Sequence, residues 1–286
     1  MSTQITSLQP LKIGNIEIGF PVVQAALSGY SDWPMRVIAR RLGAPYTICE
    51  VMLDQFLWGH VKRISPEAPV PVVEFERESF MPGGAANVAR NLTALGTGVE
   101  LFGLVGKDDG AKRLRALLKG DAVGSGGLKP VSDRMTTRKT RVVAHQQQVV
   151  RIDRETKQAG DSRTTKRLLS AVEKELAGTG AVVVADYNKG VVTQELLEGL
   201  RALCRPRGIW LSLDPKPSHQ LDISGLSLIT PNRGELFELA GLTDETRHSN
   251  PLRDKNLIAA VKAVQAAYQP ALLLVTLSEQ GMLLAQ

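Results

Sequence analysis

Short apolar runs alternate with helix-length amphipathic segments over most of this chain, and this alternation constrains the fold more than any other feature. The strand-like runs occupy residues 46–53, 99–105, 181–185, 209–213, 226–230 and 271–276. Segments with helical spacing lie between them, at 108–119, 163–177, 193–203, 235–240 and 255–268. Strands joined through helices of this length form parallel sheets with right-handed crossovers. We therefore predict an α/β fold, with a layered parallel sheet flanked by helices.

Two β-like segments fall outside this rhythm. Residues 69–77 alternate apolar and polar side chains, and Pro69 and Pro71 favour a position at the edge of a sheet. Residues 139–151 follow a loop rich in Gly, Ser and Pro, and we predict a hairpin there. These two segments are expected to form a small accessory β-sheet.

The composition indicates a globular cytoplasmic protein. Apolar residues make up 43% and charged residues 22% of the 286 residues, a balance that can bury a sizeable core. No apolar stretch is long enough for a membrane span, so no membrane partner is expected, and the first residues lack the pattern of a secretory signal. Cys49 and Cys204 are too few for a disulfide framework and fit a reducing compartment.

Positive charge is concentrated in residues 101–151, which hold eleven Lys or Arg against four Asp or Glu, in a chain of formal net charge +6. Such a segment suits an anionic ligand. A solvated basic face explains the charge equally well. No nucleic-acid-binding motif accompanies it, so we expect no nucleic-acid partner.

Polar residues follow several of the predicted strands, namely Asp54, Asp186, Asp214, Lys216 and Asn232. Open parallel sheets bind ligands beyond the carboxyl ends of their strands. Each of these residues taken singly is a common helix cap or turn residue. Their repetition at equivalent positions predicts a ligand site along this edge of the sheet.

Two consecutive glycines, Gly83 and Gly84, open a predicted helix that contains Asn87 and ends at Gly96. Backbone without side chains allows close approach of a ligand, and the first turn of a helix offers free N–H groups. This pattern predicts a cradle for a polyol or a phosphate. The alternative is a tight turn into a helix.

Other catalytic motifs are absent from the sequence. Gly106-Lys107 lacks both the upstream glycine and the hydroxyl residue of a Walker-type loop. The four histidines are scattered, which argues against a zinc site, and neither cysteine has a partner at a useful spacing for nucleophilic catalysis.

The chain from about residue 51 onward resembles the ribokinase-like carbohydrate kinases, and among them the kinases of heptose 7-phosphate. The matching stretches are VMLDQFLWGHVKRISPEAPVPVV (51–73), PGGAANVARNLTALG (82–96), KTRVVAHQQQVVRIDRE (139–155), ADYNKG (185–190), DPK (214–216), TPNRGE (230–235) and VTLSEQGM (275–282). The resemblance implies a ribokinase-like domain over residues 46–286, with lid strands at about 69–77 and 139–151. It also implies a homodimer formed through this β lid.

The resemblance carries roles for individual residues. It implies that Asp54, Gly83, Gly84 and Asn87 hold the sugar hydroxyls, that Lys139 and Arg141 meet the 7-phosphate, and that Asp186 belongs to the substrate site. It implies nucleotide contacts from Lys216, Asn232, Glu235, Thr276 and Gly281, with Glu235 acting indirectly on Mg²⁺. The implied reaction transfers the γ-phosphoryl group of Mg·ATP to the anomeric hydroxyl of D-glycero-D-manno-heptose 7-phosphate. This reaction belongs to the pathway that makes ADP-heptose, a precursor of the lipopolysaccharide core.

One part of the family pattern is not found. The resemblance assigns the carboxylate that accepts the hydroxyl proton to a Gly-Ala-Gly-Asp motif, which would lie beyond Gln286. Ala159-Gly160-Asp161 is only a superficial echo, because it precedes the nucleotide half of the sheet. We therefore expect a C-terminally incomplete kinase domain without a catalytic residue of its own and with low or no turnover.

The N-terminal segment departs from this family. Residues 11–52, with Ala25-Ala26-Leu27-Ser28-Gly29-Tyr30-Ser31-Asp32, resemble the opening βα unit of the tRNA-dihydrouridine synthases, which use FMN. We expect residues 1–45 to form an appendage with a hairpin and a helix. An FMN-dependent protein acting on tRNA and a non-catalytic sugar-phosphate-binding protein remain the two alternatives to the kinase.

Overall fold

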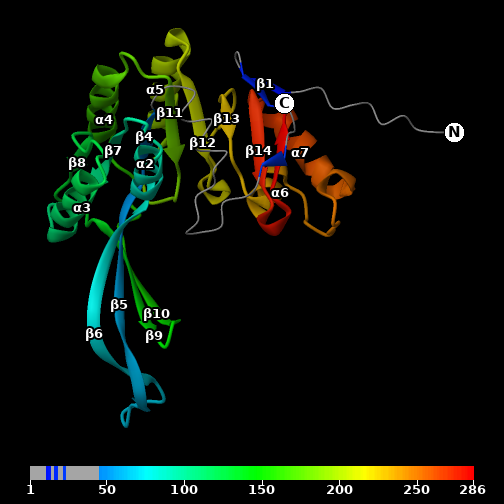
Figure 1. Ribbon diagram of the computed structural model, residues 1–286. Helices are drawn as coiled ribbons and strands as arrows, with labels where there is room; N and C mark the ends of the chain where they lie inside the picture. The colour runs from blue at the N-terminus through cyan, green and yellow to red at the C-terminus, as the bar shows by residue number, and fades with distance from the viewer. Residues whose placement is uncertain (1–10, 14–15, 19–21, 24–44) are drawn as a thin grey trace.

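The computed structural model describes residues 11–13, 16–18, 22–23 and 45–286 (Figure 1). Its largest sheet has nine strands in the order β3-β15-β14-β13-β12-β11-β4-β7-β8. These are β3 (Val22–Val23), β4 (Pro45–Cys49), β7 (Glu100–Val105), β8 (Leu128–Pro130), β11 (Ala181–Ala185), β12 (Trp210–Asp214), β13 (Leu228–Ile229), β14 (Leu272–Thr276) and β15 (Met282–Ala285). The strands from β8 to β14 pair in parallel, and β15 pairs antiparallel with both β14 and β3.

Six helices of the described chain flank this sheet. They are α2 (Ala85–Ala94), α3 (Asp109–Gly120), α4 (Ser162–Glu175), α5 (Gln194–Cys204), α6 (Arg233–Ala240) and α7 (Lys255–Tyr268). Side chains cap most of their first turns: Asp108, Asp161, Thr193 and Asp254 each accept a backbone N–H three residues ahead. The predicted α/β architecture is confirmed.

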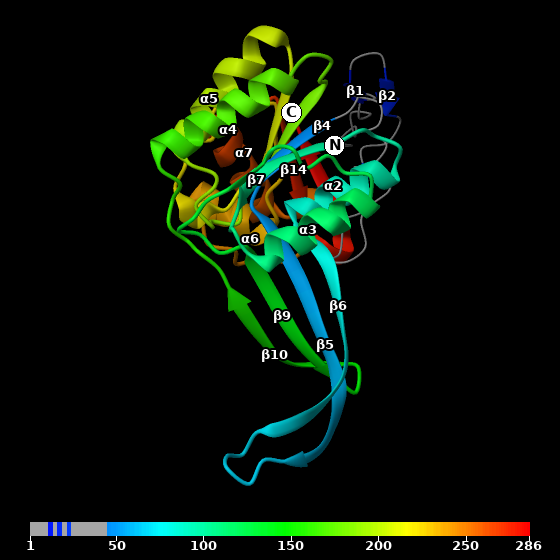
Figure 2. The ribbon, with the colours of Figure 1, turned by 90° about the vertical axis from the view of Figure 1, so that its left-hand side faces the viewer.

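The core lies on both faces of the sheet, as the alternating residues of β7 show. Leu101 and Val105 pack into a cluster with α2 and α3, whereas Phe102 and Leu104 pack into a larger cluster with α4 to α7. The two groups of helices therefore cover opposite faces, as Figure 2 shows.

A second sheet of four strands, the lid, projects from the carboxyl edge of the large sheet (Figures 1 and 2). Its order is β10-β9-β5-β6, with β5 (Val51–Ile64), β6 (Pro71–Gly84), β9 (Thr137–Ala144) and β10 (Gln147–Arg154). The predicted hairpin and the edge position of the strand after Pro69 are confirmed. The extent of the lid is a correction, because β5 is one of its two inner strands and was not predicted to belong to it.

The predicted single strand over residues 46–53 is also wrong. Cys49 ends β4 in the large sheet, Glu50 belongs to neither strand, and Val51 begins the lid strand β5. The apolar run continues through the break because Val51, Met52 and Leu53 are also buried, Val51 and Leu53 in the cluster with α2 and α3. Hydrophobic pattern alone therefore does not reveal the change of sheet.

Part of the N-terminal segment is described. Strands β1 (Leu11–Ile13) and β2 (Ile16–Ile18) form an antiparallel hairpin, and β3 pairs with β15 at the edge of the large sheet. The helix expected in residues 1–45, and the loop 25–32, lie outside the described residues. Within the described part of the chain, no helix is long and apolar enough to cross a membrane.

Candidate active site

The two glycines of the predicted cradle lie against Asp54. Gly83 is the second-last residue of β6 and pairs with β5, and a Cβ atom at Gly83 would lie 2.6 Å from Oδ2 of Asp54. Gly84 has a φ of +56°, and a Cβ there would meet the side chain of Met52 at 2.7 Å. Both positions therefore require glycine because of contacts within the protein, in addition to any approach of a ligand.

Asn87 lies in the first turn of α2, one turn after these glycines. Its side chain is half-buried and makes no hydrogen bond to any described residue. The N-cap residue of α2, Gly84, has no side chain that could accept from the first N–H groups of the helix. The N–H of Ala85 donates to the carbonyl of Glu50, and the next N–H groups of α2 have no side-chain cap. The start of α2 thus offers uncapped N–H groups and the amide of Asn87.

Asp54, Lys139 and Arg141 share one face of the lid. Asp54 is opposite Lys139 in the parallel ladder of β5 and β9, and Arg141 follows two residues later on the same face. Nη1 of Arg141 donates to Oδ1 of Asp54 at 2.7 Å, and both side chains are about three-quarters buried or more. The two residues predicted to contact the sugar and its phosphate are therefore adjacent and paired with each other.

Asp186 follows β11 and is 3% exposed. Its carboxylate lies 2.8 Å from Nδ1 of His219 and accepts the backbone N–H of Asn188 at 2.8 Å. Its own N–H donates to the carbonyl of Asp214 at the end of the neighbouring strand β12. The predicted convergence of polar residues at the carboxyl ends of these strands is thus present.

Glu50 is a site residue that the sequence reasoning missed. Its side chain is 1% exposed and accepts the backbone N–H groups of Tyr187 (2.8 Å), Val191 (3.2 Å) and Lys189. Burial raises the pKa of Glu50 to about 7, and the nearby charge of Asp186 adds to this increase. A glutamate after an apolar strand was the available signal, but its partners lie far away in the sequence.

Arg134 also binds the loop of residues 187–191 that follows Asp186, through a carbonyl oxygen of that loop. Its guanidinium donates to the carbonyl oxygens of Gln158 (2.6 Å), Lys189 (2.8 Å) and Thr156 (3.3 Å). Its side chain is buried, and burial lowers its pKa. Together Glu50 and Arg134 bind both the N–H groups and a carbonyl of residues 187–191, which carry on directly from Asp186.

The predicted nucleotide residues gather at the ends of β12, β13 and β14. Asn232 caps α6 and forms a capping box with Glu235, so the alternative interpretation of Asn232 as a helix cap is confirmed. Nζ of Lys216 lies 3.3 Å from Oε1 of Glu235. Thr276 pairs with Asn232 across an isolated bridge, and Gly281 has a φ of +86° in the turn that follows.

The partly buried carboxylates at the ends of β12 to β14 favour the binding of a cation. Burial raises the pKa of Asp214 to about 7, and the charges of Glu235 and Asp186 raise it further. Mg²⁺ in phosphoryl-transfer sites typically takes one or two carboxylates together with substrate phosphates and water. The residues present fit that requirement, although no three acidic or histidine side chains of the described chain are arranged to hold a metal by themselves.

Asp161 does not belong to this site. It lies at the start of α4, where its carboxylate accepts the N–H of Thr164 at 2.8 Å as a helix cap. No Gly-Ala-Gly-Asp motif occurs in residues 1–286. The residues predicted to contact the sugar, its phosphate and the nucleotide therefore lie at the base of the lid and along the carboxyl edge of the large sheet. The proton acceptor that the resemblance implies is not found in residues 1–286.

Comparison with known proteins places most of the chain in one group. Residues 50–286 match the pfkB family carbohydrate kinases. Proteins named bifunctional protein HldE are 40% identical over 234 residues in Helicobacter pylori strain J99 and 39% identical over 236 residues in Caulobacter vibrioides. Each alignment covers 82% of this chain but only 49% and 47% of the relative, so the chain spans about half the length of the curated relatives it matches.

Solved structures show the same fold at low identity. Phosphofructokinase-2 from Escherichia coli in complex with potassium has a TM-score of 0.66 at 21% identity, covering 85% of this chain and 75% of that one. Ribokinase from Arabidopsis thaliana complexed with ribose and ATP has a TM-score of 0.61 at 16% identity, covering 85% and 74%. The ribokinase-like architecture is confirmed. The family match begins at residue 50, and none of these relatives supports the resemblance to tRNA-dihydrouridine synthases or a role for FMN.

Proposed function

Because the chain belongs to the pfkB family of carbohydrate kinases, we propose that it binds a heptose 7-phosphate together with Mg·ATP and serves phosphoryl transfer to the anomeric hydroxyl. The observation that carries this proposal is the cluster of Asp54, Gly83, Asn87 and Arg141 at the base of the lid. It combines a carboxylate, an unused amide, free helix N–H groups and a guanidinium. These are groups that recognise a polyol with an attached phosphate.

The sugar hydroxyls would be held by Asp54, by the backbone of Gly83 and Gly84, and by Asn87. A carboxylate accepts two hydroxyl protons with directional geometry, and an amide donates and accepts at once. Asp186 would complete the substrate site from the end of β11, oriented by His219 and by the loop that Glu50 holds.

The 7-phosphate would be bound by Arg141 and Lys139 on the lid face. Arg141 reaches Asp54 at 2.7 Å, so a sugar phosphate that occupies the cradle would bring its hydroxyls to Asp54 and its phosphate to the guanidinium. The planar guanidinium suits bidentate contact with phosphate oxygens. In this proposal, two of the cations in the basic segment 101–151 bind the phosphate of the substrate.

ATP would lie at the ends of β12 to β14. Lys216 and the turn from Thr276 to Gly281 would contact the nucleotide, and Asn232 with Glu235 would lie near its phosphates and Mg²⁺. Bound Mg²⁺ would neutralise phosphate charge during transfer. The chain's own residues position the two substrates, and turnover by residues 1–286 alone is proposed to be low because the implied proton acceptor is not found in them.

A homodimer through the lid accompanies this proposal. Ile64 and Phe75 of the lid are 61% and 66% exposed, and Val150 and Ile152 on β10 are also exposed. Apolar side chains gathered on a projecting sheet favour burial against another protein surface. Analytical ultracentrifugation should detect a dimer, and Phe75→Asp should shift it to a monomer.

Calorimetry with D-glycero-D-manno-heptose 7-phosphate and with the unphosphorylated heptose tests the substrate assignment. Asp54→Asn should weaken both ligands at least about tenfold, because a charged acceptor is removed from each. Arg141→Gln should weaken only the phosphorylated sugar. Asp133→Asn, an exposed position with no described partner, is the control. Unchanged affinity of Arg141→Gln for the 7-phosphate would refute the phosphate assignment.

A further inference from the structure

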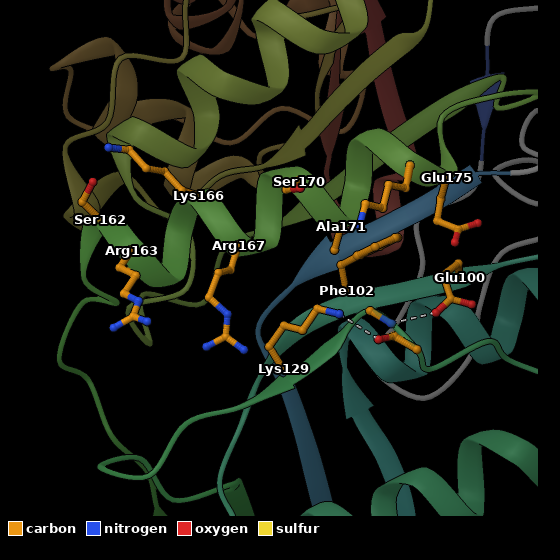
Figure 3. Close-up of a pocket in the computed structure, with 13 residues that line it drawn as sticks. Glu100, Phe102, Lys129, Ser162, Arg163, Lys166, Arg167, Ser170, Ala171 and Glu175 are labelled. Atoms are coloured by element: carbon orange, nitrogen blue, oxygen red, sulfur yellow. Dashed lines mark hydrogen bonds between the residues drawn. The ribbon is translucent and has the colours of Figure 1, made fainter.

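A hollow of about 1020 Å³ lies between α4 and the strands β7 and β8 (Figure 3). One wall is the exposed side of α4 from Ser162 to Glu175. The other wall contains Lys129 on β8 and the backbone of Gly126 and Gly127. Phe102 and Ala171 contribute apolar surface between the two walls. None of the lining residues belongs to the candidate active site.

The hollow is lined by five cationic side chains, from Lys129, Arg163, Lys166, Arg167 and Lys174. The four on α4 are exposed, and none of them forms an ion pair with a described carboxylate. Lys129 donates only to the carbonyl oxygen of Gly126 at 3.1 Å. This concentration of unpaired positive charge in one concave site is unusual for a surface that serves solubility alone.

Two carboxylates reach the hollow, and one is already engaged. Oε1 of Glu100 accepts the backbone N–H of Gly127 at 2.9 Å, which ties it to the strand wall. Glu175 lies at the far end of α4, away from Arg163 and Arg167 in Figure 3. Arg163 and Arg167 point the same way from α4, and their charges act on the carboxylate of Asp161, the N-cap of the helix, without forming an ion pair with it. Lys129 lies on the opposite wall, and its amine is directed toward the carbonyl of Gly126.

The spacing of the cations indicates the size of the ligand. Arg163, Lys166, Arg167 and Lys174 repeat at helical intervals along one side of α4, and at 1.5 Å per residue they extend over about 16 Å. A single phosphate would contact only a part of this row. A chain of several phosphates would contact most of it, with Lys129 on its other side.

We propose that this hollow binds a small polyphosphate ligand, an oligophosphate or a nucleoside polyphosphate, at a site separate from the candidate active site. The hollow has the volume of a small-molecule site, and it is open to solvent between α4 and the strand wall, so a ligand would contact both walls. This assignment does not depend on the proposed kinase function.

The site is connected to the substrate end of the molecule. Residues 155–161 lead directly into α4, and Gly160 donates to the carbonyl of Gly190 at 2.8 Å. Lys189 pairs with Glu155 at 2.8 Å in the same region. A ligand held at the start of α4 would thus contact a helix anchored to the loop that Glu50 and Arg134 hold.

Isothermal calorimetry of the full chain with inorganic tripolyphosphate, at about 0.15 M salt, tests the proposal. The triple variant R163Q/K166Q/R167Q should weaken binding at least about tenfold, since charge-assisted contacts to phosphate are lost. Two controls separate this site from others. K119Q/K255Q/K262Q removes the same charge at exposed positions elsewhere, and Lys216→Gln alters the candidate nucleotide site.

In both control variants, the affinity of the α4 hollow for tripolyphosphate should equal that of the native chain. Equal weakening in K119Q/K255Q/K262Q would mean that net charge rather than the hollow binds the anion, and would overturn the proposal. So would loss of all binding in Lys216→Gln, or binding of long oligonucleotides without binding of tripolyphosphate. Circular dichroism confirms that each variant is folded before titration.

Discussion

The carboxylate of Glu50 accepts the backbone N–H of Tyr187 at 2.8 Å, although the two residues belong to different parts of the chain. Glu50 lies between the large sheet and the lid, and Tyr187 follows Asp186 in the candidate site. The carbonyl of Glu50 also accepts the N–H of Ala85, the first residue of α2. One residue therefore joins the lid, the start of α2 and the loop of Asp186.

Stability should depend on the ionisation of Glu50. Burial raises its pKa to about 7 from an ordinary value of 4.5, so its contribution is fully present below pH 4.5 and is lost as the pH rises through 7. Glu50→Gln removes this dependence. Relative to the native chain, the free energy of unfolding of the variant should increase by about 2 kcal/mol between pH 5 and pH 8.

Urea denaturation at several pH values measures this difference. Glu198→Gln, at an exposed position on α5, is the matched control and should show no such trend. A difference between Glu50→Gln and the native chain that stays constant from pH 5 to pH 8 would show that Glu50 is ionised to the same extent in both states.

Arg134 should tolerate no replacement by lysine. A lysine at this position keeps the charge but cannot reach the carbonyl oxygens of Thr156, Gln158 and Lys189 together. We expect Arg134→Lys to lower the free energy of unfolding by about 2 kcal/mol, since buried acceptors lose their donors. Arg253→Lys, at an exposed position, should change it by less than about 0.5 kcal/mol in the same urea titration.

Gly83→Ala should lower both the stability of the chain and its affinity at the proposed sugar cradle. The added methyl group would lie 2.6 Å from the carboxylate of Asp54 and 2.9 Å from the side chain of Met52, so these two side chains must move. We expect a loss of about 1–3 kcal/mol in thermal or chemical unfolding and weaker binding of the sugar phosphate. Gly98→Ala has nothing within 4 Å of the new atom, and equal losses in both variants would contradict this explanation.

Asp254 should contribute to stability down to acidic pH. It caps α7 and also accepts hydrogen bonds from Thr246 and Arg233, and these bonds outweigh its burial and lower its pKa to about 2. A lowered pKa stabilises the fold above the ordinary value of 3.8, and this contribution is lost as the pH falls through 2. Asp254→Asn should therefore destabilise the chain at pH 7 and progressively less below pH 4, by fluorescence-detected urea unfolding. Asp133→Asn should match the native chain throughout.

Much of the fold could be predicted because periodicity reflects local burial. The helical spacing of Leu114 and Leu118 indicated α3, and the continuous apolar run AVVVA indicated the central strand β11. The glycines at 83 and 84 predicted a cradle or a tight turn into a helix, and the helix α2 begins directly after them. The reason for glycine at 83, its contact with Asp54, depends on the pairing of two distant strands and was not available.

The charge pattern was a weaker guide. The high density of Lys and Arg in residues 101–151 suggested an anion site there, but the fold places these cations in different surroundings. Arg134 is buried against carbonyl oxygens, Arg141 pairs with Asp54, and Arg113 stacks on Phe80. The concave basic site instead depends mainly on α4. The cations of α4 recur at helical spacing, at Arg163, Lys166, Arg167 and Lys174. This spacing is visible in the sequence, but a count of charges per segment does not reveal it.

The sequence by itself determined the α/β class, the positions of most helices, and the residue types along the carboxyl edge of the sheet, since hydrophobic periodicity and capping act within a few residues. The tertiary structure decided where the apolar run at Glu50 changes sheet and which distant groups face each other. Hydrogen bonds such as those from Tyr187 and Val191 to Glu50 depend on strand order and loop placement, which are set by packing between segments far apart in the chain.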